Sequence, residues 1–129
     1  MPALKLRLRP ESFCIHRLPP DRRLDLDRLR GASWYSITRT GDELSVVAPG
    51  GVDLGPGDHQ PGWSCLQIAE TLDLALVGVI AGISKVLADA NVSIFTISTY
   101  STDYILVRSG DVDAAVHALT SAGHVVVNG

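Results

Sequence analysis

Residues 63–128 read WSCLQIAETLDLALVGVIAGISKVLADANVSIFTISTYSTDYILVRSGDVDAAVHALTSAGHVVVN, and the spacing of apolar side chains in this stretch decides the fold. Four short runs rich in β-branched residues predict strands, at residues 63–69, 93–99, 104–108 and 124–128. Two intervening segments have apolar residues three and four positions apart, which predicts helices. The apolar residues are Leu76, Val79, Ile80, Ile83, Leu87 and Ala90 in the first segment, and Val112, Ala115, Val116 and Leu119 in the second. The order β-α-β-β-α-β is the ferredoxin-like pattern of an α+β fold.

Residues at the ends of the two predicted helices are suited to capping them. Asp73 is predicted to be the N-cap of the first helix, and Asn91 is predicted to end it in a left-handed conformation. Ser109 or Asp111 caps the second helix, which Gly123 closes. Each helix has a single apolar stripe, so we expect both to cover one face of a four-stranded antiparallel sheet formed within the same stretch.

The first 62 residues predict a smaller version of this arrangement, in the order β-β-α-β-β. Leucines at positions 4, 6 and 8 alternate with basic residues, which is typical of a half-buried strand, and Pro10 is predicted to end it. The remaining elements are predicted from turn residues and β-rich runs: strands at 12–18, 34–39 and 43–48, a short helix at 21–31 and a loop at 49–62. We interpret this half as a degenerate copy of the second half that lacks one helix.

Charge is distributed unevenly along the chain, which favours a division near Gly62. Residues 1–62 contain 9 Lys and Arg against 8 Asp and Glu, whereas residues 63–129 contain 2 against 6, and all seven prolines lie in the first part. Two domains with these bounds are therefore predicted, and charge scatter within one domain is the alternative. Because a domain of about 60 residues buries only marginal surface, we expect the two to pack together, with residues 49–62 as a tether.

Composition excludes several classes of protein. With 129 residues, of which 46% are hydrophobic and 19% charged, the chain has enough apolar material for a globular core. The formal net charge of -3 argues against a nucleic-acid binder, and no apolar run has the length of a signal peptide or a membrane span. Cys14 and Cys65 form no CxxC pair and have no histidine at ligand spacing, so they predict buried thiols rather than a metal or redox site. We expect a cytoplasmic protein without nucleic-acid or membrane partners.

Motifs for catalysis and for cofactor binding are absent from the sequence. It contains no GxxxxGK(S/T), GxGxxG, GxSxG or HExxH string. Four histidines lie far apart in different predicted elements and are interpreted as ordinary residues: His16, His59, His117 and His124. No nucleophile can be paired with a base, so we expect a non-enzymatic protein without a cofactor. The aromatic content of 5% also disfavours the RNA-binding variant of the ferredoxin-like fold.

Polar residues near one end of the predicted sheet offer a binding surface. Residues 98–103 are polar without interruption, and Asp73 lies at the start of the first predicted helix, where backbone N–H groups lack partners. A free α-amino acid needs a carboxylate for its ammonium group and N–H donors for its own carboxylate, and these features supply both. Asp73 and Asp103 are the predicted acidic contacts. Ordinary turn polarity and helix capping are the alternative interpretation of the same residues.

The stretch ETLDLALVGVIAGISKVLADANVSIFTISTYSTDYILVRSGDVDAAVHALTSAGH, residues 70–124, resembles an ACT domain, and VSIFTISTYSTDYILV, residues 92–107, is its most specific part. RLPPD, residues 17–21, and SITRTGDELSVV, residues 36–47, resemble the first unit of small bacterial proteins that consist of two ACT-like units and are predicted to bind amino acids. The architecture is also similar to the cytosolic arginine sensors of animals and to the regulatory ACT pairs of aspartate kinases. The similarity covers nearly the whole chain.

This resemblance implies that an amino acid binds at the interface between two ACT units, where the loop after the first strand of one unit meets the second strand of a neighbour. The implied ligand-binding residues are Leu72, Asp73, Leu74, Val77 and Gly78 in the loop, and Ile97, Ser98, Thr99 and Asp103 in the strand and its turn. Many regulatory ACT domains carry a Pro-Gly pair where this chain has Val77-Gly78, which implies a less rigid loop here.

Two functions of different classes are compatible with these observations. The first is a non-enzymatic, amino-acid-binding regulatory sensor that acts through a homodimer or a regulated partner protein. The alternative is a structural protein–protein interaction module, whose edge strands pair with another chain and whose ligand site is vestigial. Ligand-dependent stabilisation distinguishes the two, because only the sensor gains stability from an amino acid.

Overall fold

Two compact units make up the part of the chain that the computed structural model describes, residues 3–69 and 78–129. The split unit contains the chain up to Pro10 together with Ser64–Gly129, and the inserted unit contains Glu11–Trp63. The first residues of the chain therefore belong with the second half, whereas the sequence analysis assigned them to the first.

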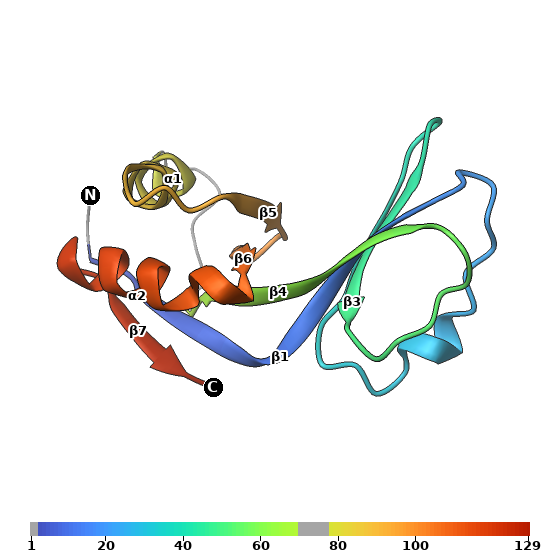
Figure 1. The fold of residues 1–129 in the computed structure, drawn as a ribbon, viewed down its shortest axis with the longest axis horizontal. Coiled ribbons are helices and arrows are strands. Elements are labelled where there is room, and N and C mark those ends of the chain that lie inside the picture. Colours follow the sequence, from blue (N-terminus) through green and yellow to red (C-terminus); the bar gives the residue numbers. More distant parts are fainter. Residues whose placement is uncertain (1–2, 70–77) are drawn as a thin grey trace. The chain divides into compact units, whose positions relative to one another are not determined.

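Two long strands, β1 (Lys5–Leu18) and β4 (Asp58–Ile68), contribute to both units (Figure 1). The other elements of the split unit follow β4 along the chain: α1 (Val79–Asp89), β5 (Ile94–Ser98), β6 (Asp103–Arg108), the 3-10 turn η2 (Ser109–Asp111), α2 (Val112–Ser121) and β7 (Val125–Asn128). Together with β4 they confirm the predicted β-α-β-β-α-β order of a ferredoxin-like α+β fold.

Both helices of the split unit pack on one face of its sheet, as their single apolar stripes predict. α1 contributes Val79, Ile83 and Leu87, and α2 contributes Ala115 and Leu119. These side chains form one buried cluster with Leu4, which precedes β1, and with residues of the strands, which include Leu6, Leu66, Ile68, Ile105 and Val107. Each fully buried leucine or isoleucine stabilises the fold by about 1.5–3 kcal/mol, so this cluster holds the helices on the sheet.

The last strand pairs in parallel with β1, so the prediction of an antiparallel four-stranded sheet formed within residues 63–128 is wrong. β7 lies parallel to the start of β1, with Lys5 opposite Val125 and Leu8 opposite Asn128. The split unit therefore has the strand order β7-β1-β4-β6-β5. The alternating leucines of β1 account for this insertion, because they extend the apolar surface that the helices cover.

A buried histidine joins the beginnings of β1 and β7. His124 is 4% exposed, and its Nδ1 accepts the backbone N–H of Leu4 at 3.0 Å. The Leu4 carbonyl accepts the N–H of Val125 at 2.9 Å, so the imidazole ring continues the hydrogen bonding of the two strands. Because Nδ1 is the acceptor, the neutral ring carries its proton on Nε2. His124 is therefore a structural part of the parallel strand pair.

The predicted C-terminal ends of both helices are confirmed, and Asp111 occupies the N-cap position of α2, where its side chain makes no capping hydrogen bond. α1 begins at Val79, and its N-cap is Gly78 with a φ of 86°. The residue predicted as the N-cap, Asp73, lies outside the described residues. Asn91 follows α1 with a φ of 61° and Gly123 follows α2 with a φ of 95°, as predicted for left-handed closures.

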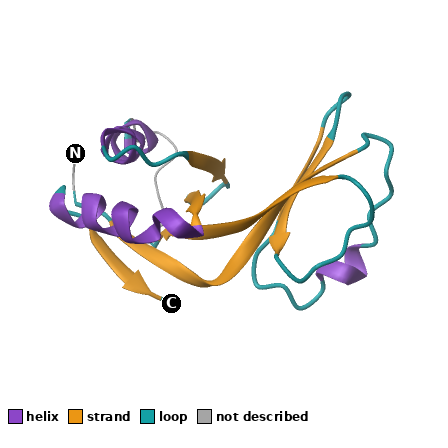
Figure 2. Cartoon of the chain, viewed as in Figure 1, coloured by secondary structure: helices purple, strands orange, loops and turns teal. Residues whose placement is uncertain are grey.

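Strands and loops form most of the inserted unit, and its one helical element among the described residues is the 3-10 turn η1 (Leu26–Leu29) (Figure 2). The helix predicted over residues 21–31 is therefore too long. β2 (Ser36–Arg39) and β3 (Leu44–Pro49) pair antiparallel and confirm the predicted hairpin. β3 also pairs antiparallel with the second part of β1.

Two predicted strand boundaries in the first half are wrong. β1 does not end at Pro10 but continues as one strand of 14 residues. Pro10 lies between the stretch of β1 that pairs with β7 and the stretch that pairs with β3, so neither neighbour needs the N–H that proline lacks. β4 begins at Asp58, so the loop predicted over residues 49–62 is shorter, and Gly62 has a φ of 82° within the strand.

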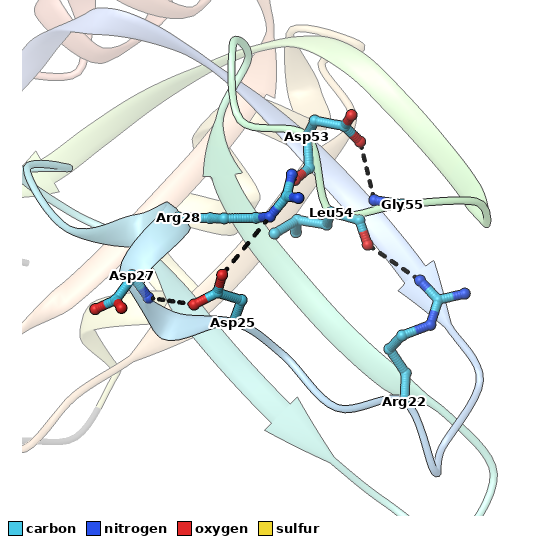
Figure 3. Close-up of polar contacts among 7 residues, drawn as sticks. All are labelled: Arg22, Asp25, Asp27, Arg28, Asp53, Leu54 and Gly55. Carbon is cyan, nitrogen blue, oxygen red and sulfur yellow. Dashed lines mark hydrogen bonds and ion pairs between the residues drawn. The ribbon is translucent and has the colours of Figure 1, made fainter.

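Arginine side chains hold the loops of the inserted unit by bonding to backbone carbonyls (Figure 3). Arg22 donates to the carbonyls of Leu54 at 3.0 Å and Pro56 at 2.8 Å, and Arg28 donates to the carbonyl of Asp53 at 2.8 Å. These donors satisfy loop carbonyls that lie outside the strands. The core of this unit is a second apolar cluster, formed by Leu18, Leu29, Leu44, Val46, Ala48 and Leu54.

His16 lies buried on the face of β1 that contributes to this second core. It is 8% exposed, its cross-strand partner is Val46, and its Nε2 has no hydrogen-bond partner among the described residues. The ring stacks on that of His59, with the centroids 6.1 Å apart. Burial lowers the pKa of His16 and the charge of His59 lowers it further, while Asp53 opposes both effects. The folded protein therefore favours the neutral ring.

Acidification is expected to destabilise the inserted unit through His16. Its folded-state pKa lies below the ordinary value of 6.5, so the unfolded chain binds the proton more tightly. The contribution of the neutral ring is complete above that ordinary value and is lost as the pH falls through the folded-state pKa. Urea unfolding should show a lower free energy of unfolding at about pH 5.5 than at about pH 7.5.

The variant His16→Gln should lose part of this pH dependence, because its side chain does not titrate. His117→Gln, on the exposed surface of α2, is the matched control and should keep the dependence of the wild type. Identical pH dependence in the wild type and His16→Gln would contradict the assignment.

Candidate functional site

The turn between β5 and β6 contains several of the residues predicted to bind a ligand. Ser98 and Asp103 are the last cross-strand pair of this antiparallel hairpin. The N–H of Thr99 donates to the carbonyl of Thr102 at 2.9 Å, and the Thr99 hydroxyl donates to the same carbonyl at 3.2 Å. The N–H of Thr102 donates back to Thr99 Oγ1 at 3.3 Å. These bonds define the conformation of the turn.

A carboxylate is held at the base of this turn. The hydroxyl of Ser98 donates to Oδ1 of Asp103 at 2.5 Å, and Asp103 is half-buried. An ionised carboxylate offers about four acceptor positions, so Asp103 retains capacity for a cationic donor. Ser98 and Thr99 are exposed, and the hydroxyl of Ser98 lies beside this carboxylate. The arrangement is suited to binding an ammonium group.

Thr102 attaches the turn to the end of β4. Its hydroxyl donates to the carbonyl of Ile68 at 2.9 Å, and the residue is 8% exposed. Near the other end of β6, the hydroxyls of Ser64 and Ser109 lie 2.9 Å apart, so β4 and β6 run in opposite directions. The turn therefore lies at the end of the sheet where β4 finishes. Sequence reasoning missed Thr102, whose one signal is its place in an unbroken polar run.

The other predicted ligand-binding residues are distributed differently. Ile97 is opposite Tyr104, and side-chain alternation places it on the other face of the sheet from Ser98. Gly78 is exposed at the start of α1. The remaining predictions lie outside the described residues and are Leu72, Asp73, Leu74 and Val77. The use of all these residues in one site stays a prediction.

Metal binding and thiol chemistry have no support within residues 3–69 and 78–129. This part of the chain contains no group of three or more His, Cys, Asp or Glu placed to hold a metal ion. Cys14 and Cys65 are buried, as predicted. Burial raises the pKa of the Cys14 thiol, and a protonated, buried thiol is a poor nucleophile. Within the same residues, no helix is long and apolar enough to cross a membrane.

Two open pockets in the inserted unit have charged walls. The larger, of ≈ 430 Å³, is lined by residues that include Asp42, Glu43 and the ion pair of Arg17 with Asp58. The side chains of that pair are 67% and 72% exposed. Exposed ion pairs contribute only about 0–1 kcal/mol to stability, so this pair holds the charged side chains of the pocket in place only weakly. The smaller pocket, of ≈ 380 Å³, lies beside Arg28. The better-organised polar site is the turn that holds Asp103.

The element order, the single helix-covered face and the polar turn define the class of this protein as a ferredoxin-like α+β domain with a polar site at one end of its sheet. Within that class, the chain belongs to the ACT domain family, whose family model matches residues 58–121. The matched region begins with the first residue of β4 and ends with the last residue of α2. The resemblance inferred from the sequence is therefore confirmed.

Solved structures and characterised proteins are similar to this chain. Protein Atu0741 from Agrobacterium tumefaciens is 30% identical with a TM-score of 0.90, over 100% of this chain and 96% of that one. The ligand-free regulatory subunit of aspartate kinase from Thermus thermophilus has a TM-score of 0.69 over 95% of this chain and 99% of that one. At 13% identity, the second similarity shows the fold alone.

Among characterised proteins, the cytosolic arginine sensor for mTORC1 subunit 1 from Bos taurus is 28% identical over 127 residues. The match covers 88% of this chain and 38% of the sensor, so the chain spans little more than a third of that relative's length. The chain is thus similar to part of an amino-acid sensor and to the fold of an enzyme's regulatory subunit.

Proposed function

We propose that this chain is a non-enzymatic, amino-acid-binding regulatory protein. Membership in the ACT domain family and the similarity to a protein described as an arginine sensor support this function. The observation that carries it is the carboxylate of Asp103, which Ser98 holds at a turn with a defined conformation. Such a carboxylate is the acceptor that the ammonium group of a free amino acid requires.

The proposed site combines this turn with the loop that precedes α1. Asp103 accepts from the ligand's ammonium group, backbone N–H groups of the loop donate to the ligand's carboxylate, and Ser98 and Thr99 line the site beside Asp103. The ligand-binding residues of the proposal are those implied by the family resemblance: Leu72, Asp73, Leu74, Val77, Gly78, Ile97, Ser98, Thr99 and Asp103. A neighbouring ACT unit completes the site, and a homodimer of this chain supplies such a neighbour.

Regulation in this proposal follows from a difference in affinity. A ligand shifts an equilibrium between two arrangements only by as much as it binds one of them more tightly. The arrangement that the amino acid favours then associates differently with a second copy of the chain or with a regulated partner protein.

Thermal unfolding with each of the twenty amino acids tests the proposed function. A ligand at about 100 times its Kd stabilises the folded protein by about 2.7 kcal/mol, which raises Tm by several degrees. We expect one or a few amino acids to produce such a rise, and size-exclusion chromatography with that amino acid to show a changed oligomeric state. If none of the twenty raises Tm while the chain still self-associates, the interaction-module alternative replaces the sensor.

A further inference from the structure

We propose that Thr102 is a positioning residue of the amino-acid site, because it fastens the turn that carries Asp103 to the end of β4. The inference rests on the proposed function for the role of the turn. Thr102 is not among the residues that the family resemblance implies. Thr102 is buried, and its hydroxyl bonds to the Ile68 carbonyl rather than facing the ligand. Its effect on binding is therefore indirect, through the position of Asp103.

All the polar groups of Thr102 are engaged. Its hydroxyl donates to the carbonyl of Ile68, its N–H donates to the hydroxyl of Thr99, and its carbonyl accepts from both the N–H and the hydroxyl of Thr99. A buried hydroxyl is unfavourable unless it is hydrogen-bonded, so the Ile68 carbonyl accounts for a threonine at this position. The bond joins residues 34 positions apart in the sequence.

The end of β4 is itself fixed, which makes it a suitable anchor for the turn. Directly after Ile68, the N–H of Ala69 donates to the carbonyl of Lys5 at 2.8 Å. The backbone at this point is therefore bonded to β1 by Ala69 and to the turn by Ile68. Through Thr102, the position of Asp103 is set relative to β4 and β1 as well as by its own hairpin. A site whose carboxylate is positioned in advance binds its ligand more tightly.

Two substitutions at position 102 separate the hydroxyl from the rest of the side chain. Thr102→Val keeps the shape and removes the donor, whereas Thr102→Ser keeps the donor. Thr96→Val is the matched control, because Thr96 is an exposed threonine of the same hairpin. Calorimetry with the amino acid that stabilises the wild type most should show about 5- to 50-fold weaker binding for Thr102→Val, and affinities within about twofold of wild type for the other two variants.

A second measurement needs no ligand. Amide hydrogen exchange at Thr99, whose N–H donates to Thr102, should be at least about tenfold faster in Thr102→Val than in the wild type, and unchanged in Thr102→Ser and Thr96→Val. Unchanged exchange in Thr102→Val would overturn the positioning role, as would wild-type affinity in that variant.

The variants also keep this inference separate from the proposed function. A wild type that binds none of the twenty amino acids contradicts the proposed function, and hydrogen exchange still decides whether Thr102 fastens the turn. If Thr102→Val does not fold, Thr102→Ser decides: a loss of affinity beyond about fivefold in that variant would overturn the role of the hydroxyl.

Discussion

Replacing Asp103 by Asn is expected to weaken amino-acid binding by about 10- to 100-fold, because the substitution removes the charge that the ligand's ammonium group requires. The amide has nearly the same shape as the carboxylate, and its oxygen can still accept from the hydroxyl of Ser98. The turn should therefore keep its conformation, so that the loss appears in affinity and not in folding. Calorimetry with the best amino acid from the thermal unfolding experiment measures the effect.

Asp113→Asn is the matched control for this prediction. Asp113 is an exposed aspartate in the first turn of α2, so its substitution removes the same charge from the same unit. We expect its affinity to stay within about twofold of wild type and its stability to change by less than about 1 kcal/mol. Undiminished binding by Asp103→Asn would leave Asp103 as a residue that only stabilises the turn with Ser98.

Replacing Gly57 by Ala is expected to destabilise the inserted unit by about 1–3 kcal/mol. A Cβ at this position would lie 2.6 Å from Cδ2 of Leu18 and 2.9 Å from the carbonyl oxygen of Arg17. Leu18 is 2% exposed and belongs to the core of that unit, and the carbonyl is part of β1, so neither atom can move without disturbing packing or strand geometry. Urea unfolding followed by tryptophan fluorescence measures the change in free energy.

Gly51→Ala tests whether any loss of glycine would have the same effect. A Cβ at Gly51 meets no atom within 4 Å, and this glycine lies in the same connection between β3 and β4. Alanine restricts the unfolded chain more than glycine does, so this variant should be as stable as the wild type or more stable by up to about 1 kcal/mol. Equal stability of Gly57→Ala and Gly51→Ala would show that the close approach of Gly57 to β1 is relieved without a penalty.

The spacing of apolar residues and the residue types at helix ends were sufficient to predict most elements of the split unit. The spacing of Val79, Ile83 and Leu87 predicted the buried face of α1, because residues three and four apart share one side of a helix. Asn91 and Gly123 predicted the ends of both helices, because few other residues adopt the left-handed conformation found there. α1 begins at Val79, the first buried described residue of that periodicity, and the predicted cap Asp73 lies outside the described residues.

The candidate site was predictable only in part, and for the same reason. Ser98 and Asp103 stand in a run of polar residues that marks the turn of a hairpin, and the hairpin brings them together as cross-strand partners. Thr102 carries no comparable signal, because its partner is a backbone carbonyl 34 residues earlier. A hydrogen bond to a distant backbone atom leaves no pattern in the neighbouring residue types.

By itself, the amino-acid sequence determined the order of strands and helices from β4 to β7, the faces that the helices bury and the polar character of the turn, since these properties depend on residues a few positions apart. The tertiary structure alone decided which strands distant in the sequence are neighbours. The alternating leucines predict that β1 has one apolar face. They do not predict that β7 pairs with β1, with a hydrogen bond between His124 and Leu4 that spans 120 positions. They also do not predict that Pro10 lies between the stretches of β1 that pair with β3 and with β7, where the N–H that proline lacks is not required by either strand. Strand pairing depends on how all the apolar faces and unpaired backbone groups of the chain are satisfied together. The residues near any one strand therefore do not indicate its distant partner.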